Sequence, residues 1–336
     1  MTIEDSATVA ASGIDAAVES REATLGRILS EKYNVKEESL IQALVALGEA
    51  TSHITLHLQN YVKHSYAGSQ NASGDEQLEL DIQCDKAVFD AVRASGVFHT
   101  VASEETPEET KVSGDDDDGR AVYSLGCDPL DGSSIIDANF SVGSIYGIWP
   151  GKKLLGRSGR EQVAAAVALY GPRTVLCVAL PGTPKNQVFE VTLVRNRTEW
   201  EVSRESIQIE PKGKVFAPGN LRATTDHENY SKMMQYWIQN RYQLRYSGGM
   251  VPDVYHIFAK SKGIFTNVSS PTAKAKLRLL YEVAPIGLIV ECSGGEAIHE
   301  AEDKSVLDIV IEDCDQRTGV CFGSKDEVAK YKEFMF

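Results

Sequence analysis

Two aspartates follow an apolar run near the middle of the chain, spaced so that they could bind a metal ion. Asp128 and Asp131 supply hard carboxylate oxygens, and Pro129 between them fixes its own φ. The backbone carbonyls between the two carboxylates, such as that of Leu130, become possible further ligands. A donor set made only of oxygens favours Mg²⁺ over Zn²⁺.

A Gly-Ser-Ser turn comes directly after these aspartates and could bind a phosphate. Gly132 lets the backbone approach an anion closely, and Ser133 and Ser134 offer N–H and hydroxyl donors to phosphate oxygens. Cation ligands and anion donors would then lie side by side. The alternative is a solvated Asp-Pro turn followed by a Gly-Ser loop, because single short motifs often match by chance.

Further acidic groups could complete such a site from other parts of the chain. Glu104 and Glu105 follow a predicted strand and form either a solvated turn or the second half of a metal site, and their spacing alone favours the turn. Glu282 is a lone acid in an apolar stretch that reaches Val290. Burying a carboxylate is costly unless it meets a cation or a metal, so Glu282 is a candidate for either contact.

Two segments in the second half of the chain carry cations that could hold an anion. Residues 245–250 join an arginine and a tyrosine to a glycine pair, and this loop is equally consistent with a phosphate grip and with a mobile turn. Residues 272–278 bring three cations up to the apolar stretch before Glu282. The alternative for this second segment is a charged helix end.

Composition and charge exclude several classes of partner. The 336 residues suffice for two packed units or one large α/β body, and a net charge of −14 argues against nucleic-acid binding. The sequence has no run of about 20 apolar residues that could span a membrane. Residues 1–22 are acidic where a secretory or organellar presequence would be basic, so we expect a cytoplasmic protein that binds no membrane.

Six cysteines are scattered along the chain without a Cys-x-x-Cys pair. We expect them to be reduced, mostly buried apolar residues. The closest pair, Cys314 and Cys321, could meet across a turn, but a disulfide is the less favoured interpretation in a reducing compartment.

Helices and strands must position these candidate residues. Apolar spacing predicts helices at residues 39–63, 86–94, 161–169 and 226–240 and a last helix from Lys325, with Asp226 and Ser324 as caps. Strands are predicted at residues 75–81, 97–102, 121–126, 141–149, 174–180, 187–194, 199–203, 214–218, 263–268 and 306–311. We expect a flexible leader at residues 1–24 and a domain boundary in the polar stretch 205–213.

Five motifs, taken in order along the chain, resemble the sugar bisphosphatases of the fructose-1,6-bisphosphatase superfamily. They are Gly74-Asp75 with Asp81, Ser103-Glu104-Glu105, Asp128 to Ser134, Gly248 to Asp253, and Lys276 to Glu282. Within that family, residues 220–224 and 267–276 look like the sedoheptulose-1,7-bisphosphatase branch. The resemblance covers almost all of the chain after the leader.

The resemblance implies a fold and an activity. The fold is an α/β layered αβαβα sandwich of the fructose-1,6-bisphosphatase type, with residues 25–212 as the metal and phosphate subdomain and 213–336 as the sugar-phosphate subdomain. The activity is Mg²⁺-dependent hydrolysis of the 1-phosphate of sedoheptulose 1,7-bisphosphate, with two or more Mg²⁺ per site and Mn²⁺ as a substitute. The partner is this small sugar bisphosphate, and a homodimer or homotetramer is expected.

The resemblance also implies a role for each site residue. The implied metal ligands are Glu104, Asp128, Asp131, Glu282 and the Leu130 carbonyl. The implied catalytic residues are Asp81 and Glu105, which take the proton of the attacking water, and Asp75 at a metal-linked position. The implied substrate-binding residues are Gly132, Ser133, Ser134, Asn220, Arg245, Tyr246, Gly248, Met250, Lys276 and Arg278. The family counterpart of Arg245 serves a neighbouring subunit.

The sequence departs from the family pattern at three places. Asn267 stands where the fructose-type enzymes carry a tyrosine, which puts direct transfer of their sugar site in doubt, and Ile135 stands where they usually carry an asparagine. The plastid sedoheptulose enzymes have a cysteine pair in the region matching residues 64–77, and this chain has none there. A thioredoxin-operated switch of that kind is therefore not predicted.

Three other functions compete with the preferred one. A fructose-1,6-bisphosphatase, alone or with dual activity, is the nearest. An inositol monophosphatase shares the Asp-Pro-Leu-Asp-Gly type of motif but has little need for Arg245, Tyr246 and Lys276. A phosphosugar-binding scaffold without turnover is the non-enzymatic alternative, and the completeness of the acidic set argues against it.

Overall fold

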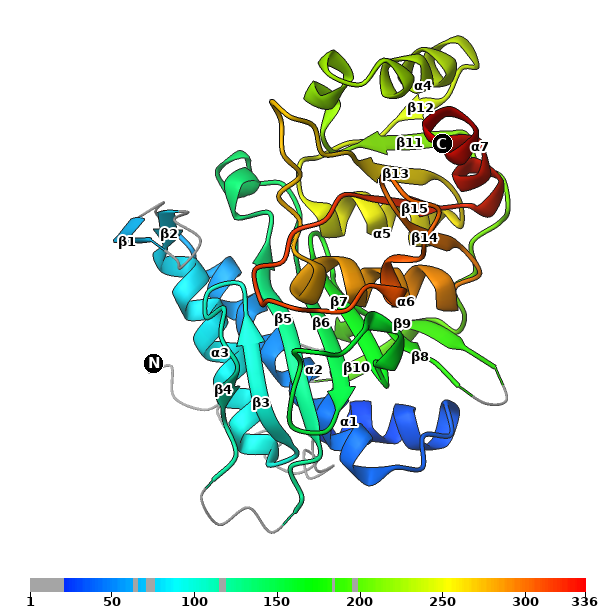
Figure 1. Cartoon of the computed structure of the whole chain (residues 1–336). Helices are drawn as coiled ribbons and strands as arrows, with labels where there is room; N and C mark the ends of the chain where they lie inside the picture. The colour runs from blue at the N-terminus through cyan, green and yellow to red at the C-terminus, as the bar shows by residue number, and fades with distance from the viewer. Residues whose placement is uncertain (1–20, 63–65, 71–75, 115–118, 183–184, 195–198) are drawn as a thin grey trace, which may run out of the picture.

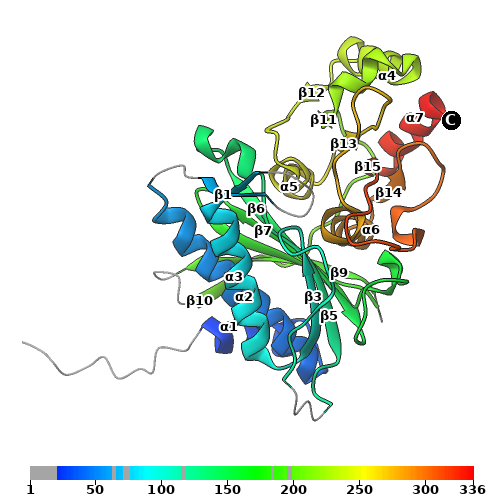
Figure 2. The same ribbon diagram turned by 60° about the vertical axis from the view of Figure 1, so that its left-hand side comes forward.

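The fold is a stack of five layers, in which helices cover and separate two β-sheets. The computed structural model describes residues 21–62, 66–70, 76–114, 119–182, 185–194 and 199–336. Figures 1 and 2 show helices on one face of the larger sheet, further helices between the two sheets and others on the far face of the smaller sheet. This order confirms the predicted αβαβα sandwich. Within the described ranges, no helix is long and apolar enough to cross a bilayer.

The larger sheet has eight strands in the order β10-β9-β8-β7-β6-β5-β3-β4. They are β3 (Phe98–Ser103), β4 (Thr110–Lys111), β5 (Tyr123–Asp131), β6 (Val142–Pro150), β7 (Ala164–Tyr170), β8 (Thr174–Leu180), β9 (Gln187–Val194) and β10 (Glu199–Arg204). Neighbouring strands are antiparallel except β3 and β5, which run parallel. The carboxyl ends of β3 and β5 therefore meet at one edge of the sheet.

The smaller sheet has five strands in the order β12-β11-β13-β15-β14. They are β11 (Val215–Pro218), β12 (Gln243–Leu244), β13 (Ile264–Asn267), β14 (Glu296–His299) and β15 (Val320–Gly323). A separate two-stranded hairpin pairs β1 (Tyr66–Gln70) with β2 (Glu76–Leu78). The parallel strands β12, β11 and β13 bring their carboxyl ends to the same side.

Seven helices complete the described layers. Those on the larger sheet are α1 (Arg21–Arg27), α2 (Glu38–Gln59) and α3 (Glu79–Ser95); those between the sheets are α5 (Met250–Lys260) and α6 (Ala284–Cys292); those on the smaller sheet are α4 (Glu228–Gln239) and α7 (Lys325–Met335). Apolar side chains form one core on each face of the larger sheet and a third beneath α4 and α7. All six cysteines are buried and unpaired, as predicted.

The helix predicted at residues 161–169 is wrong, because this segment forms strand β7. Its small residues alternate between two cores: Ala164 and Ala166 pack on the side of α2, whereas Ala165 and Val167 pack on the side of α6. A strand that is buried on both faces reads as a continuous apolar run, so periodicity cannot separate it from a helix.

The helix that was predicted to begin near residue 86 begins earlier, at Glu79. The preceding segment was predicted as a strand over residues 75–81, but among its described residues only those of β2 are extended. The Asp81 carboxylate accepts the backbone N–H of Leu78 at 2.9 Å. This contact satisfies a donor at the start of α3, which ends as predicted at Gly96, in the left-handed conformation.

Two further predictions in the second half need correction. The N-cap position of α4 is His227 rather than Asp226. The Asp226 carboxylate accepts the N–H of Thr272 at 3.0 Å instead of capping the helix. Residues 306–311 are not a strand and begin with a short 3₁₀ turn capped by Ser305. Helix α5 was not predicted. The other predicted strands from residue 97 to 268 and helix α2 are confirmed, with shifts at their ends, and β5 extends to Asp131. Ser324 lies at the predicted N-cap position of α7, but its side chain makes no capping hydrogen bond and its Oγ instead accepts the N–H of Gly263 at 3.2 Å.

Candidate active site

Both aspartates lie in β5 itself, which continues through them. Side chains three residues apart point to opposite faces of a regular strand. The pairing with β6 shifts here, since Asp128 lies opposite Ile145 whereas Asp131 lies opposite Gly143. Three steps along β5 thus match two steps along β6. This bulge brings the two carboxylates together on one side of the sheet, the side that faces α5 and α6.

The first turn of α5 holds Asp131 in place. Its Oδ1 accepts the N–H of Met250 at 3.1 Å and its Oδ2 accepts the N–H of Val251 at 2.6 Å. Gly143 makes this approach possible, because a Cβ added there would lie 2.4 Å from the Cβ of Val251. A helix N-terminus with free N–H groups favours a carboxylate in this position.

Glu282 reaches the same place from a distant part of the chain. It lies in a buried π-helical turn, η6 (Leu279–Val283), directly before α6. Its Oε2 accepts the N–H of Arg278 at 2.6 Å. Gly126 of β5 lets η6 lie close, because a Cβ there would be 2.6 Å from Leu280 Cδ1. Backbone contact therefore fixes Glu282 above β5.

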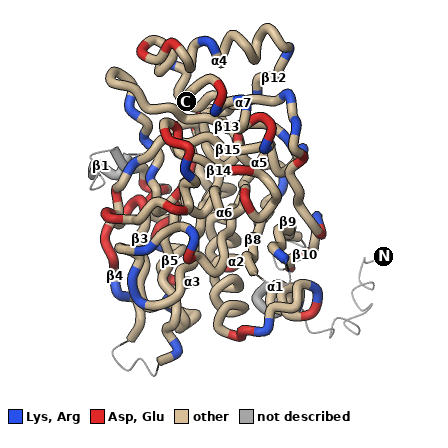
Figure 3. Tube along the Cα trace, turned by 45° about the vertical axis from the view of Figure 1, so that its right-hand side comes forward, with Lys and Arg blue, Asp and Glu red and all other residues tan. Residues whose placement is uncertain are grey.

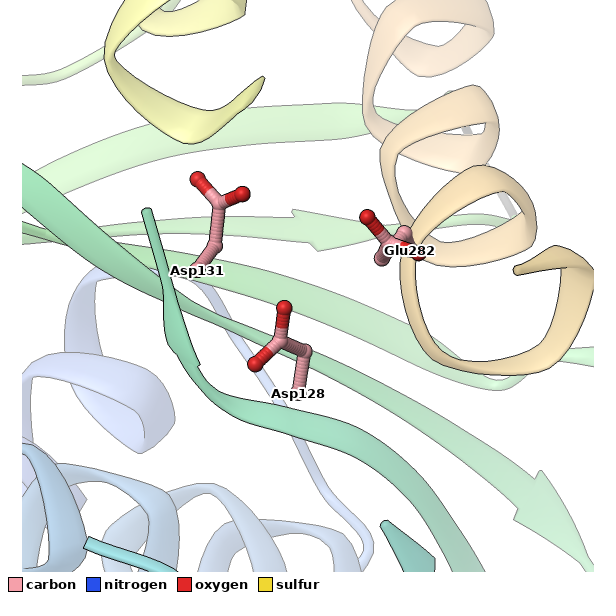
Figure 4. A group of neighbouring side chains, drawn as sticks. All are labelled: Asp128, Asp131 and Glu282. Atoms are coloured by element: carbon pink, nitrogen blue, oxygen red, sulfur yellow. The ribbon is translucent and has the colours of Figure 1, made fainter. Parts of the chain in front are cut away.

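Asp128, Asp131 and Glu282 form an acidic cluster, in which one oxygen of each carboxylate lies within 4.8 Å of the others. Figure 4 shows Asp128 and Asp131 on one strand and Glu282 on the facing helical turn. Their exposed fractions are only 3%, 8% and 5%. Three buried carboxylates at this separation repel one another unless a cation lies between them, so the donor set fits a hard divalent ion.

The pKa values of all three carboxyl groups are raised, chiefly by burial and further by neighbouring charges. Burial, followed by the charges of Glu104, Asp131 and Glu282, raises the pKa of Asp128 well above its usual range. Burial raises the pKa of Asp131 to about 7, although the N–H groups of Val251 and Met250 oppose the shift. Burial, followed by the charge of Glu104, also raises the pKa of Glu282. Each group disfavours its charged form in the metal-free protein.

A pH dependence of stability follows from these shifts. A carboxyl group whose pKa is raised in the folded state stabilises the fold below its unfolded pKa of about 4, and this contribution is lost as pH rises through the folded value. For Asp131, that value is about 7. We therefore expect Mg²⁺ to raise the Tm more at pH 8 than at pH 5, because only at pH 8 does it neutralise charged groups. Calorimetry at both pH values checks this, and equal Mg²⁺-induced shifts would contradict it.

Glu104 lies beside the cluster because β3 and β5 are parallel. Ser103, at the end of β3, lies opposite Cys127, and the N–H of Glu104 donates to the Cys127 carbonyl at 3.1 Å. The next residue on β5 is Asp128, whose pKa the charge of Glu104 helps to raise. The parallel pairing thus joins two motifs that spacing alone left separate.

Arg278 pairs with acidic groups of this site. Its guanidinium forms an ion pair with Glu104, and its Nε donates to Asp315 Oδ1 at 2.9 Å. The side chain is only 6% exposed. Arg278 therefore lies next to Glu104, a predicted metal ligand. No contact of Arg278 tests whether it also binds the substrate, so that role stays a prediction.

The Gly-Ser-Ser turn lies against the glycine pair of the predicted sugar-binding loop. Gly132 has a φ of +90°, which favours glycine, and it begins a short 3₁₀ turn, η2 (Ser133–Ala138). A Cβ on Gly132 would lie 3.5 Å from the Cα of Gly249, and a Cβ on Gly248 would lie 3.2 Å from Ile135 Cγ2. The predicted phosphate turn and the predicted sugar-binding loop are therefore neighbours.

The predicted catalytic acids lie on the α3 side of the cluster. Asp81 is buried in the first turn of α3, and Glu105 follows β3. Burial raises the pKa of the Cys84 thiol, and the charges of Asp81, Asp128 and Glu105 raise it further, which places all three carboxylates around that residue. Asp75 lies outside the described residues, so its predicted role has no structural account.

The residues predicted to bind the sugar and the far phosphate lie at the carboxyl ends of β11, β12 and β13. Arg245 and Tyr246 follow β12 and are exposed, and the Tyr246 hydroxyl donates to the Gly219 carbonyl at 3.0 Å. Asn220 is buried, and its Nδ2 donates to the carbonyls of Val268 and Ala273, each at 2.8 Å. Asn220 thus holds the loop that leads to the exposed Lys276.

Asp85, which was not predicted as a site residue, supports the turn that carries Glu104 and Glu105. Asp85 accepts the Ser103 hydroxyl at 2.6 Å and the Thr106 hydroxyl at 3.2 Å, one on each oxygen. It thereby fixes both ends of the turn that carries the two glutamates. An acid one helical turn after Asp81 on α3 is the only signal that the sequence offers for this role.

Comparison with known proteins shows that this αβαβα sandwich with its buried acidic cluster belongs to a class of metal-dependent phosphatases. Two family models match it: "Fructose-1-6-bisphosphatase, N-terminal domain" over residues 23–204 and "Fructose-1-6-bisphosphatase, C-terminal domain" over residues 209–336. The chain belongs to the fructose-1,6-bisphosphatase family.

Relatives from both branches of the family resemble this chain. The chloroplastic sedoheptulose-1,7-bisphosphatase of Spinacia oleracea is 47% identical over 89% of this chain and 75% of its own length. The class 1 fructose-1,6-bisphosphatase of Pelobacter propionicus is 35% identical over 89% of this chain and 88% of its own.

Solved structures agree with the fold. A Toxoplasma gondii protein described as a sedoheptulose-1,7 bisphosphatase has a TM-score of 0.84 at 34% identity. The fructose-1,6-bisphosphatase of Leishmania major in its holo form has a TM-score of 0.83 at 29% identity. Each comparison covers 93% of this chain and 98% of the solved one.

Proposed function

We propose that this chain hydrolyses the 1-phosphate of sedoheptulose 1,7-bisphosphate and releases sedoheptulose 7-phosphate and inorganic phosphate, with Mg²⁺ at the acidic cluster. The observation that carries the proposal is the buried set of Asp128, Asp131 and Glu282 in a chain 47% identical to a sedoheptulose-1,7-bisphosphatase. Three buried acids without a cation would be an unexplained cost, whereas a metal-assisted phosphatase needs them.

Different residues of the site would bind the metal, accept a proton and bind the phosphate. The proposed Mg²⁺ ligands are Asp128, Asp131, Glu282, Glu104 and the Leu130 carbonyl, a set large enough for two or more ions and open to Mn²⁺ as well. The bound metal would neutralise phosphate oxygens and lower the pKa of a water. Asp81 and Glu105 would accept the proton of the attacking water. The Gly132–Ser134 turn would donate hydrogen bonds to the phosphate that leaves.

The other end of the substrate would lie at the carboxyl ends of the smaller sheet. Arg245, Tyr246 and Lys276 offer a guanidinium, a hydroxyl and an ammonium group there, and Gly248 and Met250 would border the sugar. Holding the far phosphate fixes the bisphosphate with its 1-phosphate at the metal, so that the attack is in line.

The deciding experiment measures phosphate release from sedoheptulose 1,7-bisphosphate and from fructose 1,6-bisphosphate under identical Mg²⁺ conditions. We expect the higher kcat/KM on the seven-carbon substrate. At least tenfold higher efficiency on the six-carbon substrate would make the chain a fructose-1,6-bisphosphatase. Binding of either sugar without phosphate release would favour the scaffold.

Lys276→Ala is expected to raise the KM for the bisphosphate by about 10- to 100-fold with little change in kcat. A hydrogen bond between an ammonium group and a phosphate is worth about 1.5–3 kcal/mol, and tenfold corresponds to about 1.4 kcal/mol. Lys232→Ala, an exposed lysine on α4, is the matched control. Steady-state kinetics check the effect, and an unchanged KM would instead favour a monophosphatase of the inositol type.

We also propose the class of partner, the oligomeric state, the division into subdomains and the location of the protein. Lys and Arg are interspersed with Asp and Glu along the trace in Figure 3, which supports a small anionic substrate rather than nucleic acid.

We propose a homodimer or homotetramer, which light scattering tests, and a division of the chain near residue 212, which limited proteolysis tests. A cytoplasmic location is also a proposal, although the Spinacia oleracea relative is chloroplastic, and imaging of the tagged full-length chain decides between them.

A further inference from the structure

The first turn of α5 connects the acidic cluster with the sugar-binding loop, defined here as residues 245–249. The N-cap of α5 is Gly249, which has no side chain to cap the helix. Asp131 accepts the N–H groups of Met250 and Val251, and Pro252 has no N–H to offer. The helix start is therefore capped by a proposed metal ligand that lies far away in the sequence.

Asp253, in the same turn, points its carboxylate back toward the sugar-binding loop. Its Oδ1 accepts the N–H of Ser247 at 2.7 Å and its Oδ2 accepts the N–H of Gly248 at 3.2 Å. The residue is only 4% exposed. A buried carboxylate that receives two backbone N–H groups holds them more strongly than a neutral acceptor would.

These contacts fix the part of the loop that the sheet does not hold. Arg245 is still tied to β11, because its N–H donates to the Phe216 carbonyl at 3.0 Å. The next residues leave the sheet, and Gly248 has a φ of +106°, where few other residues are stable. The Asp253 carboxylate thus receives the N–H groups at the point where the chain turns from β12 into α5.

We propose that Asp253 is a positioning residue, which sets the conformation of the sugar-binding loop and thereby the KM for the bisphosphate. It does not touch the reacting phosphate. It acts through the backbone of Ser247 and Gly248, which lies between Tyr246 and Gly249. Gly249 in turn lies beside Gly132, the first residue of the predicted phosphate turn. The kinetic part of this inference rests on the proposed function, whereas the loop conformation does not.

The test is Asp253→Asn, which keeps the size of the side chain but replaces one acceptor oxygen by a donor group facing an N–H. We expect the KM for sedoheptulose 1,7-bisphosphate to rise about tenfold, with kcat and the half-saturating Mg²⁺ concentration within about threefold of wild type. Asp326→Asn, which removes a first-turn acid of α7 on the far layer, is the matched control and should change none of these values. An unchanged KM, or a fall in kcat at unchanged KM, would overturn the proposal.

Hydrogen exchange gives a readout that does not depend on turnover, and its wild-type part needs no variant. In the wild-type protein, the amides of Ser247 and Gly248 should exchange slowly although the loop around them is exposed, and in Asp253→Asn they should exchange at least tenfold faster. Unprotected amides in the wild type would overturn the inference even if Asp253→Asn failed to fold. Protected amides in a chain that hydrolyses no sugar bisphosphate would instead leave the loop conformation standing and reject the proposed function.

Discussion

Asp128→Asn is expected to lower kcat by about 10³-fold or more at saturating Mg²⁺ while leaving the protein folded. Metal ions supply several kcal/mol of transition-state stabilisation in phosphoryl transfer, and each 1.36 kcal/mol corresponds to about tenfold in rate. Asparagine keeps the oxygen that accepts the N–H of Leu130 at 2.9 Å, so the local backbone should persist. Single-turnover and steady-state phosphate release measure the loss.

The same substitution should stabilise the metal-free protein at pH 8. Burial and the neighbouring charges of Glu104, Asp131 and Glu282 disfavour the charged form of Asp128, and the neutral amide removes that repulsion. We therefore expect a higher Tm than wild type without Mg²⁺ and a smaller rise of Tm on adding it. Asp326→Asn should match wild type in both respects. A near-wild-type rate, or a lower metal-free Tm, would contradict the assignment of Asp128 as a ligand.

Glu104→Gln is expected to lower kcat by about 10²-fold and to raise the Mg²⁺ concentration needed for half-maximal activity. Glutamine keeps the size of the side chain and one acceptor oxygen but removes the negative charge beside Asp128. Arg278 would keep its contact with Asp315, so the expected loss concerns the metal rather than the fold. A titration of activity with Mg²⁺ measures both values.

Glu228→Gln is the matched control for this second variant, because it makes the same chemical change on the exposed first turn of α4. It should leave kcat and the Mg²⁺ midpoint unchanged. If Glu104→Gln behaved like this control, Glu104 would be a partner of Arg278 only, and the metal site would reduce to the cluster on β5 and η6.

The types of the site residues were readable from the sequence, whereas their contacts were not. The pair Asp128 and Asp131 stood out at once, but their common orientation depends on a bulge that the pairing with β6 sets. Spacing alone favoured a solvated turn for Glu104, because its position beside β5 depends on a parallel pairing between distant segments. Resemblance to the family, rather than local pattern, connected these motifs.

Helix α5 shows why part of the fold could not be predicted. Its N-terminus lacks a capping side chain at Gly249, and the groups that accept its first N–H donors belong to Asp131, 119 residues before Met250. Local rules for helix starts cannot detect such a partner. The prediction of a helix where β7 lies failed for a related reason. Burial on both faces removes the alternation of apolar and polar residues that marks a strand.

The most direct test of the proposed metal centre is ³¹P NMR of sedoheptulose 1,7-bisphosphate with the wild-type protein. Spectra are recorded with Mg²⁺ and with a chelator. With Mg²⁺, the signal of the 1-phosphate should convert to inorganic phosphate while the signal of the 7-phosphate persists. With the chelator, both signals should remain. Loss of the 7-phosphate, or equal conversion without metal, would contradict the assignment of the acidic cluster around Asp128, Asp131 and Glu282 as the metal centre for 1-phosphate hydrolysis.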